Sequence, residues 1–260
     1  MALLYGSAKK IAETFRKNFA DSLLCLGNQS VVMFEEDLKD LKLSNFHKKN
    51  LTSLKKNLTE YLPKNSFKKK YVNKLFFSIL GFSEIKSLDV SKYQNADFLY
   101  DLNKDKPPKS LKKKFDCILD GSTIEHIFNT FNALKNINQF LKTGGYVIHI
   151  TALNNMSKDG FYQFHPNYFK DFYSTNGYKI IKNLFWVINY EKKIFEKNAK
   201  TKRGIDKFFV NFEKANRYSK KKGLPLQVIF IAKKIMDKKF KAPQQKFYIN
   251  KKNWFKEIKT

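Results

Sequence analysis

The sequence predicts a doubly wound α/β fold with a Rossmann-like, mostly parallel sheet, because short apolar runs alternate with segments of helical periodicity. The runs that we interpret as strands are 22–26, 84–89, 96–101, 115–121 and 146–151. Three of them end in or beside an aspartate, namely Asp89, Asp101 and Asp120. Strands joined by helices pair in parallel through right-handed crossovers. We therefore expect these aspartates at one edge of the sheet, where such folds bind ligands.

Helical patterns separate these strands. Residues 7–19 carry an amphipathic pattern behind a Ser7 cap, and residues 124–141 carry the strongest helical periodicity of the chain. Further helices are expected within 39–80 and at 165–175. Two β-rich segments, 178–190 and 224–234, follow without a clear crossover helix between them. They predict an antiparallel edge strand in a sheet of seven strands.

The length and composition indicate one main domain. The chain has 260 residues, of which 42% are hydrophobic, so it can bury one sizeable core. We expect a domain over 1–235 with helical insertions at about 39–80 and 191–223. A lysine-rich tail is expected at 236–260.

Nothing in the sequence indicates a membrane span or export. The longest apolar run, near 75–82, is far shorter than the ~20 residues that a spanning helix needs. The amino terminus lacks a basic segment followed by an apolar core. Cys25 and Cys117 stand alone in apolar runs, where buried reduced thiols are expected. These features predict a cytoplasmic protein.

The formal net charge of +28 suggests an acidic partner such as nucleic acid. However, only three of the 51 basic residues are arginines, the residue that recognises phosphates and bases in a bidentate manner. A solvated lysine surface is therefore the favoured interpretation, and nucleic acid is the less favoured partner. Residues 191–260 hold 22 basic and six acidic side chains, so we expect any anion to bind there.

The ends of the predicted strands carry polar residues suited to a nucleotide-like ligand. Asp89 is placed to accept hydrogen bonds from ribose hydroxyls, or else it starts a turn. Asp101 could reach the exocyclic amine of adenine, or cap a turn. Gly27 after the first strand permits close approach of a ligand to the backbone, although it belongs to no Gly-x-Gly-x-x-Gly array.

The order of these segments resembles the motifs of class I S-adenosylmethionine-dependent methyltransferases. The segments are LLCLG at 23–27, SLD at 87–89, DFLYDLN at 97–103, FDCILDG at 115–121 followed by EH at 125–126, and LKTGG at 141–145. The resemblance covers roughly 20–235 and is most specific at 115–126 and 141–145. The sequence departs from the family in its first loop, where CLGNQ at 25–29 replaces an acidic residue and a Gly-x-Gly pattern.

The resemblance implies S-adenosylmethionine as cofactor and assigns a part of it to each strand end. The implied contacts are Gly27 and Asn28 for the methionine part, Asp89 and Val90 for the ribose, Asp101 and Leu102 for the adenine, and Asp120 and Gly121 for the sulfonium. The implied reaction is methyl transfer to an O, N, S or C atom, in which positioning supplies much of the catalysis.

A base is required only where the acceptor must first lose a proton. The candidates are His126, after the fourth strand, and His165, after the fifth, although each could instead hold a helix start. His149 lies in a predicted buried strand and is interpreted as a core histidine with satisfied hydrogen bonds. His47 lies among lysines and is predicted to be solvated.

The acceptor is expected to contact the aromatic loop after the fifth strand. Phe161, Tyr162 and Gln163 in this loop resemble the acceptor-facing segment of a bacterial methyltransferase subgroup associated with surface-polysaccharide modification. A small-molecule or sugar-containing acceptor is therefore the favoured partner. The spacing of Asp120, Glu125 and His126 matches no strong metal-ligand pattern, so no metal is expected.

Two other functions agree with the sequence. A methyltransferase of RNA or another polyanion would use the basic C-terminal region as its docking surface. A non-catalytic Rossmann-like binding protein would explain the atypical first loop. The sequence does not predict the oligomeric state.

Overall fold

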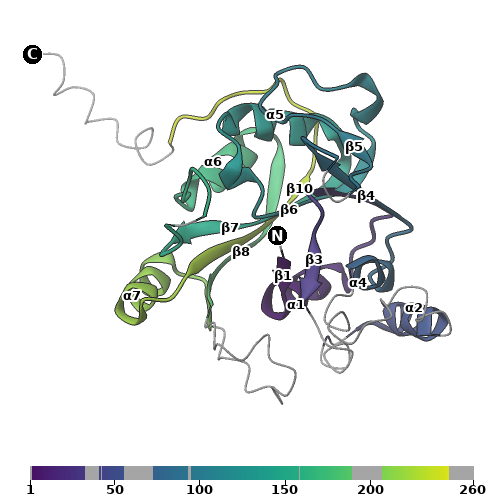
Figure 1. Cartoon of the computed structure of the whole chain (residues 1–260), viewed down its shortest axis with the longest axis horizontal. Coiled ribbons are helices and arrows are strands. Elements are labelled where there is room, and N and C mark those ends of the chain that lie inside the picture. The colour runs from purple at the N-terminus through teal and green to yellow at the C-terminus, as the bar shows by residue number, and fades with distance from the viewer. Residues whose placement is uncertain are drawn as a thin grey trace, which may run out of the picture.

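The computed structural model describes residues 2–32, 41, 43–55, 73–92, 95–157, 159–188 and 207–245. Eight strands form the main sheet (Figure 1). Their bounds are β2 Ser22–Leu26, β4 Glu84–Asp89, β5 Phe98–Leu99, β6 Phe115–Gly121, β7 Leu141–Asn154, β8 Tyr178–Val187, β9 Lys207–Phe209 and β10 Leu226–Lys234. A separate parallel pair consists of β1 Ala2–Leu4 and β3 Ser30–Val32.

The strand order in the main sheet is β5-β4-β2-β6-β7-β10-β8-β9. The first five strands pair in parallel, whereas β10 is antiparallel to both β7 and β8, and β9 is antiparallel to β8. The predicted α/β fold with a mostly parallel sheet is therefore confirmed. The sheet has eight strands rather than seven because β9 adds an antiparallel edge, and β10 is inserted inside the sheet.

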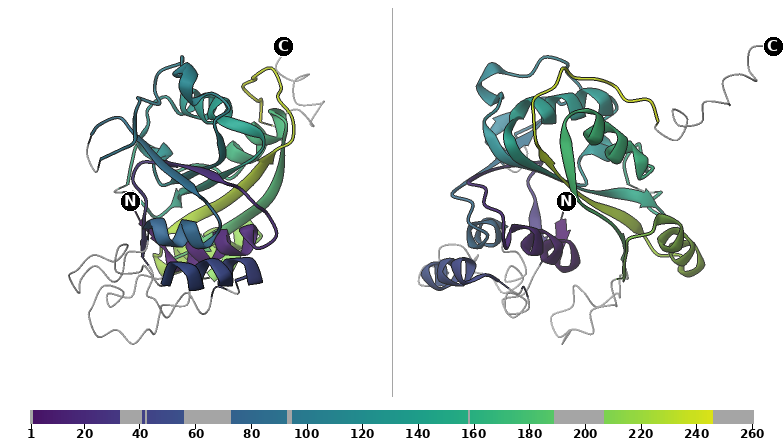
Figure 2. Two further views of the ribbon diagram at one scale, coloured as in Figure 1. Left: turned by 90° about the vertical axis from the view of Figure 1, so that its right-hand side faces the viewer. Right: turned by 180° about the vertical axis from the view of Figure 1, so that it is seen from behind.

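Helices cover both faces of the sheet. Their bounds are α1 Tyr5–Phe15, α2 Asn45–Lys55, α4 Asn73–Ile79, α5 Thr130–Phe140, α6 Asn167–Thr175 and α7 Phe212–Lys222, with short 3-10 turns η3 Lys109–Leu111 and η4 Ile124–His126. Helices α5 and α6 lie on one face, and α1 and α4 lie on the other (Figures 1 and 2). None of the helices in the described ranges is long and apolar enough to cross a bilayer.

The alternation of side chains along the central strands builds two apolar cores. Leu24 and Ile118 face the core beneath α5 and α6, whereas Leu23 and Cys117 face the core beneath α1 and α4. Strands covered on both faces are apolar throughout. Cys25 and Cys117 are buried free thiols, as expected, and burial raises the pKa of Cys25 to about 12.

Two local predictions are wrong at the amino-terminal side. Helix α1 starts before Ser7, whose hydroxyl donates to the Leu4 carbonyl oxygen (2.8 Å) instead of capping backbone N–H groups. His47 is fully buried in α2 rather than solvated, because α2 packs on α4 and turns this ring inward. Burial lowers the pKa of His47.

The long helix predicted at 124–141 is divided. The Asp120 carboxylate accepts the backbone N–H groups of Thr123 (2.8 Å) and Ile124 (3.1 Å), which holds η4 as a short turn. Asn129 then starts α5 by accepting the Asn132 N–H (3.0 Å). The chain enters β7 at Leu141, so Gly144 and Gly145 lie inside a strand and do not mark the end of the helix.

Parts of the expected insertions can be placed. Helices α2 and α4 lie within 39–80, and β9 and α7 lie within 191–223. The remainder of both insertions, and the tail from residue 246, lie outside the described residues.

The strand order reverses between β2 and β6. From β2 the sheet extends to β4 and β5 on one side, and to β6 and β7 on the other. Loops that leave the carboxyl ends of β2 and β6 therefore lead to opposite sides of the sheet. The place between these two strand ends, which we call the crevice, is where open α/β sheets bind ligands. We call this side of the sheet, at the carboxyl ends of β5, β4, β2, β6 and β7, the carboxyl edge.

Candidate functional site

The loop after β2 begins with a sharp turn. Gly27 has φ +70°, a left-handed conformation that suits glycine, and its N–H donates to the Leu88 carbonyl oxygen of β4 (2.8 Å). Asn28 is exposed. Gln29 folds back under the turn, where it is only 3% exposed, and its Nε2 donates to the Leu26 carbonyl oxygen (2.7 Å).

The Gln29 carboxamide lies between the ends of β2 and β6. It packs directly on Gly121, where an added Cβ would overlap Oε1 of Gln29. Thr123 also lies at the ends of β2 and β6, because its Oγ1 donates to the Leu26 carbonyl oxygen as well (2.6 Å). Oε1 of Gln29 has no hydrogen-bond partner among the described residues. The crevice at the strand reversal thus contains a buried, unpaired acceptor.

Asp120 belongs to a buried hydrogen-bonded chain. Its second carboxylate oxygen lies 2.6 Å from Nδ1 of His149, and Nε2 of His149 lies 2.6 Å from the Tyr173 hydroxyl. All three side chains are buried. Burial raises the pKa of Tyr173 well above its usual value, so its hydroxyl keeps its proton and donates to Nε2. Nδ1 then carries the proton that Asp120 accepts.

His149 is therefore confirmed as a core histidine with satisfied hydrogen bonds. Its ring also stacks on Phe169 of α6, with the ring centroids 4.5 Å apart. Both carboxylate oxygens of Asp120 are hydrogen-bonded to groups inside the protein. Asp120 therefore borders the crevice through its position in β6 and not through its side chain. Its role toward a cofactor stays a prediction.

Glu125 in η4 is a buried carboxyl that the predicted site did not include. One oxygen accepts the Thr151 hydroxyl (2.6 Å). Burial, together with the negative charge of Asp120, raises the pKa of Glu125 to about 7. No group of three or more His, Cys, Asp or Glu side chains in the described part of the chain is arranged to hold a metal ion.

The aspartates after β4 and β5 each hold a turn with one oxygen. Oδ1 of Asp89 accepts the Ser91 N–H (2.9 Å), and Oδ1 of Asp101 accepts the Asn103 N–H (2.9 Å). These hydrogen bonds hold the pKa of Asp101 below its usual value. The second oxygen of each carboxylate is not used by its turn. Beside them Val90 is exposed, whereas Leu102 is buried.

The aromatic loop after β7 is docked on η4. The N–H groups of Phe161 (2.7 Å) and Tyr162 (3.3 Å) donate to the Glu125 carbonyl oxygen. Gly160, with φ +68°, lies so close to Glu125 that an added Cβ would overlap its backbone. Gln163 accepts the Met156 N–H with its side-chain oxygen (3.2 Å). The loop is thus attached through its backbone, which leaves Phe161 outward.

Phe128 is an exposed aromatic residue beside this loop, and the sequence interpretation did not include it among the candidates. Its side chain is 72% exposed, and its ring lies edge-to-face with that of Phe161, which is 67% exposed, at 5.9 Å. Its carbonyl oxygen accepts the Tyr162 hydroxyl (2.9 Å). The sequence feature that could have identified Phe128 is Asn129, a residue suited to cap a helix. If the helix starts at Asn129, Phe128 precedes it and is not part of its apolar face.

The two candidate bases lie in different surroundings. His126 is exposed in η4, next to the docked loop. His165 is also exposed, but its Nδ1 accepts the Asn167 N–H at the start of α6 (3.2 Å), and its ring lies 5.6 Å from that of Phe212 in α7. His126 thus directly follows Glu125, to which the loop with Phe161 is attached, whereas His165 lies toward α7.

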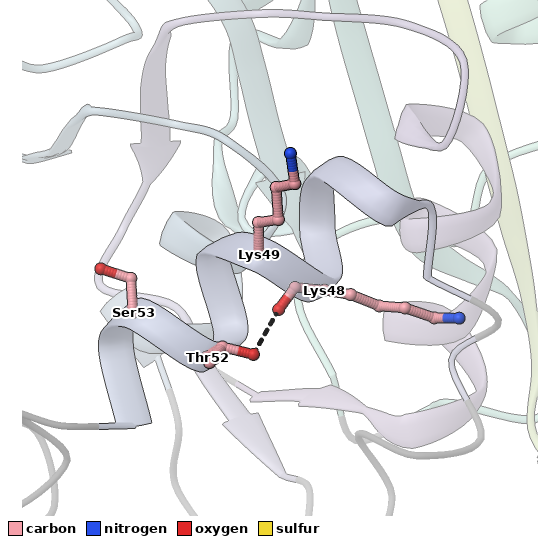
Figure 3. Close-up of a pocket in the computed structure, with 4 residues that line it drawn as sticks. All are labelled: Lys48, Lys49, Thr52 and Ser53. Atoms are coloured by element: carbon pink, nitrogen blue, oxygen red, sulfur yellow. Dashed lines mark hydrogen bonds between the residues drawn. The ribbon is translucent and has the colours of Figure 1, made fainter.

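A surface hollow lies apart from these residues (Figure 3). The described residues that line it all belong to α2, namely Lys48, Lys49, Thr52 and Ser53, and their side chains point in different directions. The Thr52 hydroxyl donates to the Lys48 carbonyl oxygen (3.0 Å), as is common on a helix surface. This arrangement shows no group of converging side chains.

Comparison with known proteins finds no matching family and no matching curated protein. Similar solved structures include the MccD protein, with 11% identity over 88% of this chain and 96% of that chain and a TM-score of 0.46. A SAM-dependent methyltransferase from Archaeoglobus fulgidus has 14% identity over 88% and 92%, with a TM-score of 0.43. At these identities and TM-scores, the function of this chain has to be argued from its own residues.

A third similar structure was solved with ligands. It is Burkholderia thailandensis 1,6-didemethyltoxoflavin-N1-methyltransferase, with bound 1,6-didemethyltoxoflavin and S-adenosylhomocysteine. Its identity to this chain is 10%, over 88% of this chain and 77% of that chain, and the TM-score is 0.43.

Proposed function

We propose that this protein transfers a methyl group from S-adenosylmethionine to a small-molecule or sugar-containing acceptor. The observation that carries the proposal is the strand order, with its reversal between β2 and β6. Four neighbouring strands, β5, β4, β2 and β6, end in or beside Asp101, Asp89, Gly27 and Gly121. Since neighbouring strands lie ~4.8 Å apart, these ends form a row roughly 14 Å long. Such a row suits an elongated ligand.

The residues of this row fit the polar groups of the cofactor. The Gln29 carboxamide lies between Gly27 and Gly121 with its Oε1 unpaired, so the present occupant of this space is incompletely hydrogen-bonded. The methionine part of the cofactor would take this space, beside Asn28, once the carboxamide has left it. The ribose hydroxyls would bind the Asp89 oxygen that its turn does not use, and the adenine amine would bind the corresponding oxygen of Asp101. The exposed Val90 would lie against the ribose or the base.

When bound, the cofactor supplies a methyl group that its positively charged sulfur has already activated. The protein then has to orient the acceptor and exclude water. We assign the acceptor contact to Phe161, Tyr162 and Gln163, and we add Phe128 because its ring forms the exposed pair with Phe161. Planar or sugar-like acceptors suit an exposed aromatic pair.

A proton acceptor is needed for an acceptor hydroxyl or amine. His126 is the first choice because it is exposed beside the docked loop. His165 is the second choice, since its Nδ1 is already bonded to Asn167 and only Nε2 is left for an acceptor.

A polyanionic acceptor such as RNA is a second candidate, favoured by the position of α7. This helix ends in Lys220, Lys221 and Lys222. Asn154 at the end of β7 donates to Asn216 of α7 (2.6 Å), so the basic helix borders the carboxyl edge. Steeply salt-dependent binding of RNA would favour this acceptor class over a neutral one.

The test is calorimetric titration with S-adenosylhomocysteine, followed by a screen with radiolabelled S-adenosylmethionine across glycan, small-molecule and RNA acceptors. Binding together with label transfer to one class supports the proposal. If S-adenosylhomocysteine does not bind at millimolar concentration, the methyl-transfer proposal is rejected and a non-catalytic binding protein is favoured. The observation that supports this alternative is that Gln29 fills the crevice.

A further inference from the structure

Gln29 is buried at a place where the chain could expose it. Its neighbour Asn28 is exposed, and the loop lies at an end of the sheet, where glutamine side chains are ordinarily hydrated. Gln29 is instead 3% exposed, with one hydrogen bond from its Nε2 to the Leu26 carbonyl oxygen. Its inward conformation therefore gives the Leu26 carbonyl oxygen a second donor beside the Thr123 hydroxyl.

The same conformation leaves an acceptor unsatisfied. Oε1 of Gln29 has no donor among the described residues, and a buried unpaired carbonyl oxygen raises the free energy of the folded state. Among the described residues the amide makes one hydrogen bond, whereas in water its carbonyl oxygen and NH₂ group can make four. Such a side chain is only weakly held, because Leu26 keeps the Thr123 hydroxyl as a donor when the amide leaves.

The surrounding residues fit this side chain closely. A Cβ at Gly121 would overlap the Gln29 carboxamide, and a Cβ at Gly27 would lie 3.3 Å from Oγ1 of Thr123. The Gln29 side chain therefore fills the space between the ends of β2 and β6, and the Thr123 side chain covers it. A ligand that lies along Gly27 and Gly121 cannot occupy this space together with the Gln29 carboxamide.

We infer that the Gln29 side chain closes the crevice of the free protein, and that it must swing out before the amino-acid end of S-adenosylmethionine or its product enters. This inference rests on the proposed function for the identity of the ligand. The nucleoside end would lie at Asp89 and Asp101, beyond the reach of Gln29, so the side chain opposes only one end of the ligand. Gln29 is then a residue that sets cofactor affinity and not a residue of the chemical step.

The closed state is tested without ligand. In protein labelled with ¹⁵N at glutamine side chains, loss of one amide signal in Gln29→Ala assigns Gln29. We expect its amide protons to exchange with water much more slowly than those of Gln163, whose side chain is exposed. Exchange as fast as that of Gln163 would overturn the closed state, whatever the ligand.

The opening is tested with two probes, S-adenosylhomocysteine and adenosine, the second of which lacks the amino-acid end. Calorimetry compares the unaltered protein with Gln29→Ala, Gln29→Ser and the control Gln139→Ala, which alters a half-buried glutamine near the amino end of β6. We expect both Gln29 variants to bind S-adenosylhomocysteine about tenfold more tightly, because no buried hydrogen bond has to be broken first. Adenosine affinity should stay the same, and Gln139→Ala should change neither.

The outcomes separate the two proposals. Equal affinity of S-adenosylhomocysteine for the unaltered protein and both Gln29 variants overturns the inference and leaves the proposed function in place. An equal gain for both probes also overturns it, because Gln29 would then act on the whole site. If neither probe binds any variant, the proposed function and the named ligand fail together, while the exchange rate of the Gln29 amide still decides whether the crevice is closed.

Discussion

Two neighbouring regions of the carboxyl edge differ in how completely their polar groups are paired. At the ends of β6 and β7, Asp120, His149 and Tyr173 form a buried chain in which each group has a partner. At the end of β2, Gln29 is equally buried, but its Oε1 has no partner among the described residues. A fully paired network in a low-dielectric interior is rigid, whereas a partly paired group is easily displaced. The first region is therefore the fixed wall of the crevice, and the second is its adaptable part.

Asp120→Ala should produce the largest change in stability. The substitution leaves Nδ1 of His149 and the N–H groups that start η4 without their acceptor inside the protein. We expect a loss of about 3–5 kcal/mol in the free energy of unfolding, measured by urea denaturation. Asp89→Ala is the control, since its half-exposed carboxylate holds only a surface turn, and it should lose under about 1 kcal/mol. Equal losses would contradict the contrast between the two regions.

The pH dependence of stability tests Glu125, a buried carboxyl beside this wall whose Oε1 has no partner among the described residues. Its pKa rises from 4.5 to about 7 on folding, so the folded state binds this proton more tightly than the unfolded chain. The resulting stability is fully present below pH 4.5 and is lost as the pH rises through 7. Relative to Glu125→Gln, the unaltered protein should lose up to about 3 kcal/mol over this interval.

The control for this measurement is Glu213→Gln on the exposed start of α7. Its stability difference from the unaltered protein is measured over the same pH interval as the baseline for removing an exposed carboxylate. The same pH dependence for Glu125→Gln would show that Glu125 ionises normally in the folded protein.

A double-mutant cycle tests the contact between Gln29 and Gly121. Gly121→Ala should destabilise the protein, because the new methyl group overlaps the Gln29 carboxamide. In the Gln29→Ala background the same substitution should be better tolerated, with a coupling free energy of about 1–3 kcal/mol by chemical denaturation. Additive effects would mean that the two residues do not touch in solution.

Asp89→Ala should have the smallest effect, which is measured in ligand binding. Loss of the carboxylate oxygen that we propose as a ribose ligand should weaken adenosine binding about tenfold, which corresponds to ~1.4 kcal/mol by calorimetry. Asp105→Ala, an exposed aspartate of a nearby loop, is the matched control. Unchanged affinity in folded Asp89→Ala would remove the ribose role and leave Asp89 as a turn residue.

Features that depend on residues close together in the sequence were predicted correctly, whereas features that depend on contacts between distant residues were not. The strands at 22–26 and 84–89 have the predicted bounds, because an apolar run between turn residues is a local signal. The division of the helix at 124–141 was missed, since it depends on Asp120 and Asn129 accepting backbone N–H groups. The placement of β10 between β7 and β8 was also missed, because strand order is a matter of long-range pairing.

The candidate site shows the same limit. Asp89, Asp101 and Gly121 could be placed at strand ends from the sequence, whereas Phe128, Glu125 and Gln29 acquire their surroundings only through tertiary contacts. No sequence pattern predicts that a polar residue such as Gln29, of a type that is usually exposed, will be buried.

The sequence by itself determined the α/β class, the strand ends that carry polar residues, and the resemblance to methyltransferases, because periodicity and local motifs encode these. Only the tertiary structure decided that the Asp120 carboxylate is hydrogen-bonded to buried groups and that the Gln29 side chain fills the crevice. The physical reason is that a side chain's burial and hydrogen-bond partners depend on residues far away in the chain, such as His149 for Asp120 and Gly121 for Gln29.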